Sequence, residues 1–485
     1  MNIKTTEKAI LCEYGDDILT SALTAESINS LDDFFEWFES RKKANQYKVF
    51  KISVNAIDDW VIDENRGDLH HKSGKFFSIV GLDVKTNYGN TPRWSQPIIN
   101  QPEIGILGFI TQKKNDILHF LVQSKMEPGN VNLLQISPTL QATRSNYTSV
   151  HGGKKPAYMD YFINNTAADV LFDQLQSEQG ARFLRKRNRN IIIEIDANEE
   201  IEVLPDFYWL TLGQVLDLLK HDNVVNMDTR TVLSIIELSP IERNLKDIYD
   251  YFDLPEFSRK ILESSLHSCG ESHLKINKII SWFTNLKTIY EVETKLIPLN
   301  ETRDWLNIDG VIRHKDCKYF SVIGVSVEAS NREVGFWQQP LIESVKGGVI
   351  AFICQMKNGI LHFLVQAKAE PGNFDIIELA PTVQFTPQNY LSPELSNKPA
   401  FYDLVMSAKS KQIRYSHLQS EEGGRFYHDQ NRYQIIEISE NINLDIPNNY
   451  NWMTIKQMKN IIKYSNYFNI EARGLLSCLS YRDGE

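Results

Sequence analysis

Short runs that are strongly hydrophobic, or that alternate hydrophobic with polar residues, fill two long stretches of the chain. In ILHFLVQSKM, for example, Leu118 and Phe120 alternate with His119 and Gln123. Because successive side chains of a β-strand point to opposite faces, this period of two predicts strands. Between about residue 47 and residue 196, the runs are KFFSIVGLDV, EIGILGFI, ILHFLVQSKM, VNLLQIS, DVLFDQLQ and NIIIEID. Turn residues separate them, which predicts a β-rich domain.

Helical patterns lie before and after this stretch. Residues 17–44 are predicted to be helical, with Ser30 as an N-cap because a serine side chain can accept a hydrogen bond from the first helical turn. After the strands, Thr211 is a second predicted N-cap, ahead of GQVLDLLKH. A further helix is expected to open at Asp228 or Thr229.

The whole pattern returns 243 residues later. LHFLVQSKMEPGN and LHFLVQAKAEPGN match at eleven of thirteen positions. The same offset carries FFSIVG onto YFSVIG, PTLQATRSNY onto PTVQFTPQNY and LQSEQGARF onto LQSEEGGRF. A register that holds this long without a slip indicates two copies of one domain.

Runs of strands with helices at their ends predict an α+β fold made by tandem duplication, rather than a parallel doubly wound sheet. A chain of 485 residues is long enough for two modules that each bury a core. We expect an N-terminal helical segment over residues 1–45, a first module over 46–238, a helical connector over 239–275 and a second module over 276–485. The connector is also expected to supply the leading helix of the second copy.

Charge and cysteine content narrow the class of protein. The formal net charge of −10 argues against a nucleic-acid-binding surface, which needs a basic stripe. The five cysteines form no CxxC pair and do not match between the copies, which argues against a disulfide framework or a zinc site. Neither a signal-peptide pattern nor a span-length apolar stretch is present. We therefore expect a cytoplasmic protein without a membrane or nucleic-acid partner.

One polar strand face is the same in both copies. His119, Gln123, Lys125 and Glu127 share a face of the predicted strand, and both differences between the copies fall on the opposite, apolar face. The Pro-Gly that follows Glu127 fits the central positions of a type II turn. This polar face is either a buried hydrogen-bonded network or the lining of a ligand site.

The segment PTLQATRSNYTSVHGG (138–153) is dense in hydroxyl and amide groups. Such groups hydrogen-bond sugar hydroxyls or a pyrimidine edge, and Tyr147 can stack or donate a proton. The first copy has HGG from His151 onwards where the second copy has ELS. The segment is either a polar loop that closes the sheet or part of a site, and the asymmetry indicates that the copies no longer do the same work.

A basic run lies in LQSEQGARFLRKRNRN (175–190). Most charge runs are solvated surface, and this is the simpler interpretation for Lys186 and Arg187. Arg182 and Arg189 differ because they recur in the second copy, and two guanidinium groups can grip a diphosphate bidentately. The second copy dilutes the rest of the run, so we expect the first module to hold a diphosphate-bearing substrate.

Several familiar catalytic patterns are missing from the sequence. It contains no GxxxxGK[ST] loop and no GxGxxG between a strand and a helix. It also lacks GxSxG, HExxH and any His/Cys/Asp cluster with metal-ligand spacing. A catalyst of this composition is expected to use general acid–base groups, with no cofactor and no metal.

These strings resemble a known family. The strings QPIINQPEIGILGF, QSKMEPGN, SPTLQATRSNYTSVHGG, LQSEQGARF and KRNRN, with FWQQPLI, QAKAEPGN, LAPTVQ and EEGGRFYHDQNRY in the second half, resemble the NDP-hexose 2,3-dehydratases, which make 2-deoxy sugars. The likeness runs from about residue 30 to residue 480. It implies two Nudix-like modules, each a mixed sheet flanked by helices, assembled as a homodimer. No Nudix-type REUxEExGU string is present.

The resemblance implies dTDP-4-keto-6-deoxyglucose as the substrate and an NADPH-dependent ketoreductase as the downstream partner. A C4 ketone acidifies the C3 proton, so loss of water across C2 and C3 needs a base, a proton donor and an enolate stabiliser. We expect Glu127 or His151 as the base, Tyr147 or His119 as the donor and Lys125 as the stabiliser.

Binding roles are assigned in the same way. Arg182 and Arg189, with Arg144, are expected to hold the diphosphate, and Trp94 or Tyr158 to contact the nucleobase. The further expected substrate contacts are Gln123, Asn130, Thr143, Asn146, Gln176 and Glu178.

Two alternatives to the dehydratase follow from the same residues. One is a non-catalytic nucleotide-sugar-binding protein, and the other is a nucleotide-sugar hydrolase of the Nudix type. For the dehydratase, subunit contacts are a further route by which second-module residues such as Arg425 or Tyr433 enter the pocket.

Overall fold

Each repeat builds a seven-stranded sheet from its alternating runs. The computed structural model describes residues 17–143, 155–163, 168–238, 245–267, 272–330, 334–390 and 398–482. In the first sheet the strand order is β10-β11-β6-β7-β12, with β8 beside β7 and β9 beside β6. Its strands are β6 (Gly105–Lys114), β7 (Ile117–Met126), β8 (Leu134–Ser137), β9 (Leu140–Ala142), β10 (Asp169–Ser177), β11 (Arg187–Ile195) and β12 (Phe207–Thr211). β6 and β11 run parallel and the other pairs antiparallel, so the sheet is mixed.

The second repeat builds the equivalent sheet. Its order is β22-β23-β18-β19-β20, with β21 beside β18 and β24 beside β19. Its strands are β18 (Gly348–Lys357), β19 (Ile360–Lys368), β20 (Glu378–Ala380), β21 (Val383–Phe385), β22 (Ile413–Ser420), β23 (Gln430–Ile438) and β24 (Tyr450–Met453). The parallel pair is again the central one, β18 with β23. The duplication that the sequence predicts is therefore present in the fold.

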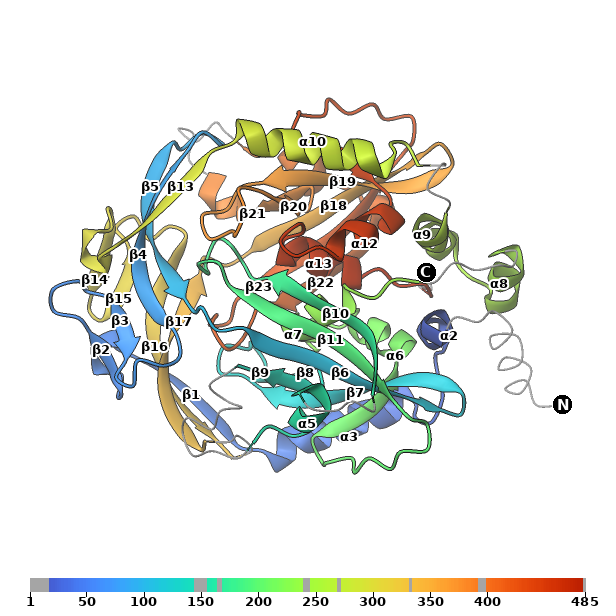
Figure 1. Cartoon of the computed structure of the whole chain (residues 1–485), viewed down its shortest axis with the longest axis horizontal. Coiled ribbons are helices and arrows are strands. Elements are labelled where there is room, and N and C mark those ends of the chain that lie inside the picture. The colour runs from blue at the N-terminus through green and yellow to red at the C-terminus, as the bar shows by residue number, and fades with distance from the viewer. Residues whose placement is uncertain are drawn as a thin grey trace.

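The helices cover these sheets and pack between them. They are α2 (Asp17–Leu23), α3 (Leu31–Ala44), α5 (Met159–Ile163), α6 (Leu212–Leu218), α7 (Met227–Leu233), α8 (Leu245–Phe252), α9 (Glu256–Leu266), α10 (Ile276–Ile289), α11 (Tyr402–Met406), α12 (Ile455–Ile462) and α13 (Ile470–Ser477). In Figure 1, α3 and α10 lie on the outer sides of the two mixed sheets, and α7 and α13 lie between the sheets. The protein is thus α+β, with most of its secondary structure in sheets.

The helix caps agree in part with the sequence. Ser30 caps α3 and Thr211 caps α6, each accepting a hydrogen bond from the backbone N–H three residues later. The predicted single helical region over residues 17–44 is instead two helices with a break between them. The helix expected to open at Asp228 or Thr229 opens at Met227, because the Asn226 side chain caps it.

The two repeats exchange strands, which the sequence pattern did not predict. β1 (Tyr47–Ile52) leaves the first module and pairs along β16 in the second, and β13 (Val292–Ile297) pairs along β4 in the first. The first five-stranded sheet contains β13, β2 (Trp60–Ile62), β3 (Leu69–His71), β4 (Ser78–Thr86) and β5 (Arg93–Asn100). The second contains β1, β14 (Trp305–Ile308), β15 (Val311–His314), β16 (Phe320–Ala329) and β17 (Phe336–Ser344). Figure 1 shows these exchanged sheets together on the left.

The exchange joins the cores of the repeats. One hydrophobic cluster combines Leu69 and Ile79 of the first repeat with Trp305 of the second. In the same cluster the rings of Phe183 and Phe426, which are repeat equivalents, meet edge to face with centroids 5.9 Å apart. Aromatic pairs of this geometry add to the stability gained by burial. The sequence ranges 46–238 and 276–485 therefore do not correspond to two separate bodies.

Candidate functional site

Each repeated EPGN turn packs against the other repeat, at the segment that follows the string LQSE (QGARF at 179–183 and EGGRF at 422–426). The Gly372 N–H donates to the Gly180 carbonyl at 2.7 Å, and the Arg185 N–H donates to the Gly372 carbonyl at 2.7 Å. In the other copy, the Gly129 N–H donates to the Gly423 carbonyl at 2.8 Å. The two motifs that recur at the same offset therefore contact each other across the repeats, although they lie far apart in the chain.

The glycine in these turns is required because another backbone segment passes close to it, and not because the turn needs a positive φ. Asn130 donates its N–H to the Glu127 carbonyl, so a β-turn forms as expected. Gly129 is not among the residues with positive φ, so the turn is not of type II. A Cβ at Gly129 would overlap the carbonyl oxygen of Phe426, and one at Gly372 would overlap that of Phe183. Only glycine lets the two backbones come this close.

A cavity of about 670 Å³ opens where the second EPGN turn meets the first repeat. Lys368, Glu370 and Glu471 of the second repeat line it, together with Trp94 and Arg182 of the first repeat. Its volume lies within the range of roughly 300–1,000 Å³ that is usual for small-molecule sites. The cavity therefore combines residues that the sequence places in different modules.

Polar groups on the second-repeat side form two hydrogen-bonded groups. The Lys368 Nζ lies 2.7 Å from the Glu370 Oε1, while the Glu370 Oε2 is buried with no hydrogen-bond partner among the described residues. The Gln384 amide donates to the Glu471 Oε1 at 2.9 Å, and the Asn469 amide donates to the Gln384 Oε1 at 3.2 Å. One oxygen of Glu370 and one of Glu471 thus have no hydrogen-bond partner among the described residues.

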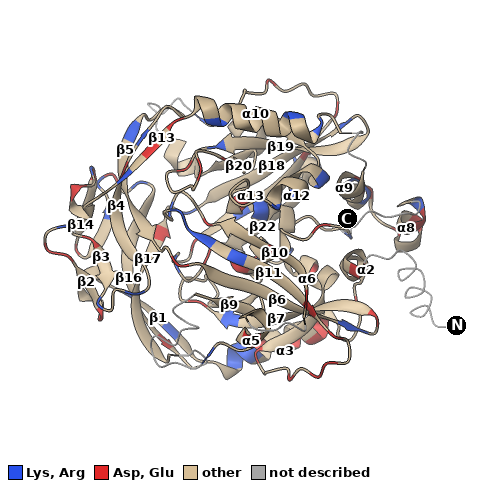
Figure 2. Cartoon of the chain, viewed as in Figure 1, with Lys and Arg blue, Asp and Glu red and all other residues tan. Residues whose placement is uncertain are grey.

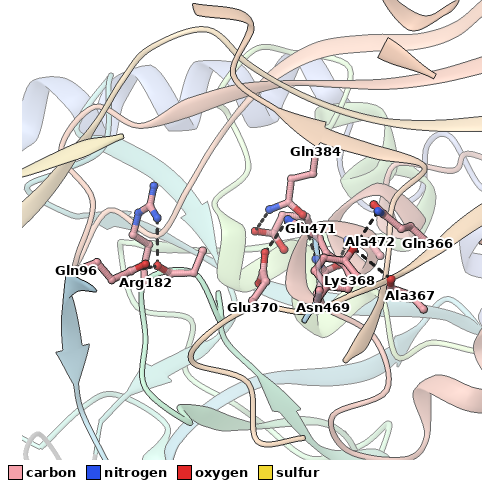
Figure 3. Close-up of polar contacts among 12 residues, drawn as sticks. Gln96, Arg182, Gln366, Ala367, Lys368, Glu370, Gln384, Asn469, Glu471 and Ala472 are labelled. Carbon is pink, nitrogen blue, oxygen red and sulfur yellow. Dashed lines mark hydrogen bonds and ion pairs between the residues drawn. The ribbon is translucent and has the colours of Figure 1, made fainter. Parts of the chain in front are cut away.

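The opposite side of the cavity belongs to the first repeat. The Arg182 guanidinium lies 4.2 Å from the centre of the Phe320 ring and donates to the Ala181 carbonyl at 3.1 Å. The Gln96 amide donates to the same carbonyl at 3.0 Å and accepts a hydrogen bond from the Trp94 indole at 2.9 Å. Figure 3 shows Arg182 and Gln96 apart from the cluster of Lys368, Glu370 and Glu471. A cation thus faces an acid–base cluster across the cavity.

Burial sets the protonation of several groups in this cavity. It raises the pKa of Glu471 to about 8, and the nearby Glu370 charge adds to the effect. Burial also raises the pKa of Glu421 to about 7 and raises that of Asp429. The hydroxyl of Tyr390, the repeat equivalent of Tyr147, also has a pKa raised by burial. At neutral pH Glu471 is therefore mostly protonated beside the Lys368–Glu370 pair, as proton donation requires.

The first-repeat counterpart of this cluster is built differently. The Lys125 Nζ donates to the Gln141 carbonyl at 2.7 Å, and the Gln141 amide donates to the Glu127 Oε1 at 2.7 Å. The Asn226 amide also donates to Gln141, at 3.1 Å. Lys125 and Gln123 line a cavity of about 40 Å³, and Glu127 is not among its lining residues. The lysine and the glutamate of the first repeat are thus joined through Gln141, whereas Lys368 and Glu370 contact each other directly.

Some residues predicted as site residues are held elsewhere. His119 is fully buried on β7, with its ring N–H directed to the Ile117 carbonyl at 2.7 Å, and burial lowers its pKa to about 4. Lys125 lies six positions further along the strand, a distance of about 20 Å. Arg189 forms a two-bond ion pair with Asp173 at 2.6 and 2.8 Å, apart from the cavity that Arg182 lines. The structure thus separates His119 from Lys125 and Arg189 from Arg182.

The remaining predicted residues have mostly local partners. Gln176 donates to Gln174 and to the Ile462 carbonyl, and Glu178 accepts from Asn188. The Tyr158 hydroxyl donates to the Glu202 carbonyl at 2.6 Å and lies outside the lining of the 670 Å³ cavity. Asn130 is buried in the docked turn, and Thr143 follows β9 at the edge of a described range. Arg144, Asn146, Tyr147 and His151 lie outside the described residues.

Sequence reasoning missed several cavity residues. Gln96, Gln384 and Glu471 were not predicted, and Lys368 and Glu370 entered only as counterparts of Lys125 and Glu127. The 243-residue offset carried the relevant signal, because it maps each second-repeat residue onto a polar first-repeat residue. What the offset does not reveal is which segment of one repeat faces which segment of the other.

Figure 2 shows basic and acidic residues interspersed along the described ribbon. Within the described ranges, no group of three or more His, Cys, Asp or Glu side chains is arranged to hold a metal ion. In the same ranges, no helix has both the length and the apolar composition for a membrane crossing.

The fold and the cavity define a class of protein: a duplicated α+β chain whose exchanged repeats enclose acid–base groups opposite an arginine. The family model for NDP-hexose 2,3-dehydratases matches residues 31–236 and 276–479. The chain belongs to this family of enzymes. It is 44% identical over 454 residues to a dTDP-4-dehydro-6-deoxy-alpha-D-glucopyranose 2,3-dehydratase of Saccharopolyspora spinosa, covering 92% of this chain and 90% of the relative.

Two further relatives carry the same printed name. The protein from Streptomyces violaceoruber is 41% identical over 449 residues, which cover 92% of this chain and 96% of that protein. The protein from Amycolatopsis orientalis is 40% identical over 474 residues, which cover 96% of this chain and 94% of that protein. Both repeats are therefore part of the similarity.

Proposed function

We propose that this enzyme removes water across C2 and C3 of dTDP-4-keto-6-deoxyglucose, in the biosynthesis of deoxysugars. The observation that carries the proposal is the cavity in which Lys368 and Glu370 face Arg182 of the other repeat. A sugar nucleotide needs a site with two regions: a cation that binds its diphosphate and acid–base groups that contact the reacting sugar ring. The names of the three relatives and the family match support the same substrate class.

The proposed reaction begins at Glu370. Its carboxylate, which lines the cavity, takes the C3 proton, and the electron pair moves toward the C4 ketone oxygen. The Lys368 ammonium, 2.7 Å from the other Glu370 oxygen, stabilises the developing enolate. The C2–O bond then breaks, and Glu471, neutral because burial raises its pKa to about 8, gives the leaving hydroxyl its proton. Water leaves, and the C3 enol tautomerises to a 3,4-diketo-2,6-dideoxy sugar.

Binding and rate follow from the same geometry. Arg182 and Trp94 both line the cavity, which supports Arg182 as the group that holds the diphosphate and Trp94 as the contact to the nucleobase. The Tyr390 hydroxyl stays protonated and is a second donor to the sugar. Positioned acid–base groups contribute roughly 10²–10⁴-fold to rate, and an oxyanion donor about 10²–10³-fold. These terms do not require a redox step.

This location differs from the sequence expectation, which placed the chemistry at Lys125 and Glu127 of the first repeat. The two strand ends are equivalent by duplication, so a pair of matched substitutions decides between them. We expect Glu370→Gln to lower kcat by about 10²–10⁴-fold. We expect Glu127→Gln to lower it far less, because the cavity proposed to hold the sugar is lined by Glu370 and not by Glu127.

The assay follows loss of the 4-keto sugar, with the product trapped by a ketoreductase and NADPH. Circular dichroism confirms that each variant is folded. Loss of turnover in Glu127→Gln alone would move the chemistry to the first repeat. A folded parent chain that binds the sugar nucleotide and never turns it over would favour the binding-protein alternative.

Three further expectations belong to this proposal. The diketo product is reactive, and we propose that an NADPH-dependent ketoreductase consumes it. The chain is proposed to act as a homodimer in the cytoplasm, without a metal or cofactor. We also propose a Nudix-like origin for each module, a kinship that the mixed sheet between helices supports.

A further inference from the structure

A buried arginine on α13 crosses from the second repeat to the first. Arg473 has no exposed surface, and its guanidinium donates to the Ser177 carbonyl at 2.5 Å and to the Phe468 carbonyl at 2.6 Å. Its Nε donates to the Thr231 hydroxyl at 3.2 Å. Ser177 lies on β10 and Thr231 on α7, both in the first repeat. Two of the three hydrogen bonds of this guanidinium named above therefore go to the other repeat.

Arg473 links the two chain segments that lead to opposite sides of the cavity. On its own helix, Glu471 lies two residues earlier and lines the cavity. On the other side, Ser177 ends β10, and the chain continues through Gln179 to Arg182, both of which line the cavity. The arginine therefore ties the element that carries the acid to the segment that carries the cation.

The first-repeat side is also braced within itself. The Ile99 N–H donates to the Arg182 carbonyl at 2.8 Å, and the Gln96 amide donates to the Ala181 carbonyl at 3.0 Å. Both Gln96 and Ile99 lie on β5 with Trp94. The proposed nucleotide subsite therefore moves as one unit, and a change at the link to α13 displaces that whole unit relative to Glu471.

We propose that Arg473 is a positioning residue that sets the distance between the acid–base cluster and the diphosphate anchor. This inference rests on the proposed function of the cavity. Arg473 touches neither the cavity nor the sugar, and acts through α13 and the Ser177–Arg182 segment. A displacement of about 1 Å at the reacting groups costs up to roughly 10²-fold in rate.

The duplication supplies a matched control. Arg230 on α7 is the repeat equivalent of Arg473, is equally buried, and donates to the Ser420 carbonyl at 2.5 Å and to Gln419 at 3.2 Å. Lysine at either position keeps the positive charge but loses the planar guanidinium, which donates several hydrogen bonds in fixed directions. Both lysine variants should therefore lose similar stability, while the change at 473 falls on the link between Glu471 and Arg182.

The experiment compares Arg473→Lys with Arg230→Lys. For each variant, kcat is measured on the sugar nucleotide. Titration calorimetry with TDP gives the Kd and the fraction of protein that is competent to bind. For Arg473→Lys we expect kcat to fall about 10–100-fold, with the Kd of TDP within threefold of the parent. For Arg230→Lys the fall in kcat should be at least fivefold smaller. Thr231→Val, which removes only the Nε contact, should lower kcat a few-fold and serves if Arg473→Lys does not fold.

Two results for Arg473→Lys overturn the inference: an unchanged kcat in the folded variant, or a fall in kcat that equals the fall in binding-competent protein. Failure of the proposed site looks different, because Arg182→Met would then leave the Kd of TDP unchanged and Glu370→Gln would retain kcat. A larger loss in Arg230→Lys than in Arg473→Lys would also overturn the inference.

Discussion

Replacing Gly372 by alanine tests the docking of one repeat onto the other. A Cβ at this position would overlap the carbonyl oxygen of Phe183, so the turn must retreat from the first repeat. The retreat weakens two hydrogen bonds, from Gly372 to Gly180 and from Arg185 to Gly372. At about 1 kcal/mol for each bond, with about 1–3 kcal/mol for overpacking, the free energy of unfolding should fall by about 3–5 kcal/mol. Gly372 does not have a positive φ, so alanine adds no backbone strain.

The change is measured as the shift of the urea unfolding midpoint, with the slope checked for constancy. Gly335→Ala is the control, because among the described residues a Cβ there meets only the Ala329 carbonyl oxygen, at 3.7 Å. It should change stability by less than about 0.5 kcal/mol. If Gly372→Ala were as stable and as active as the parent, the two motifs would not be in the close contact described.

Three other changes probe the site and the scaffold. Glu471→Gln should lower kcat about 10²-fold or more. Because burial raises the folded pKa of Glu471 to about 8, the folded state keeps a proton that the unfolded chain loses above roughly pH 4.3, so stability falls as pH rises from about 5 to 8. That fall should be smaller in Glu471→Gln, and equal urea midpoint shifts in both proteins would contradict the assignment. Arg189→Ala should change KM less than about twofold because Asp173 already holds this arginine, and a tenfold rise in KM would place it at the substrate. Ser30→Ala should lower the free energy of unfolding by about 1 kcal/mol through loss of the α3 cap, which a urea titration measures.

The sequence by itself determined the local elements and the duplication. The alternation in ILHFLVQSKM gave β7 its bounds, because side-chain period is a local property. Ser30 and Thr211 marked helix starts, since their hydrogen bonds reach only three residues along the chain. The same offset that revealed the repeat also identified the paired Lys125–Glu127 and Lys368–Glu370 positions and the family resemblance.

The tertiary structure alone decided which repeat each segment serves. The exchange of β1 and β13 leaves no local trace, because a strand has the same period whichever neighbour it pairs with. The meeting of the Gly372 turn with the segment that ends at Arg182 depends on that exchange, and so does the cavity between them. Burial then fixed the protonation of Glu471, a property that arises from the surrounding protein and not from the residue type.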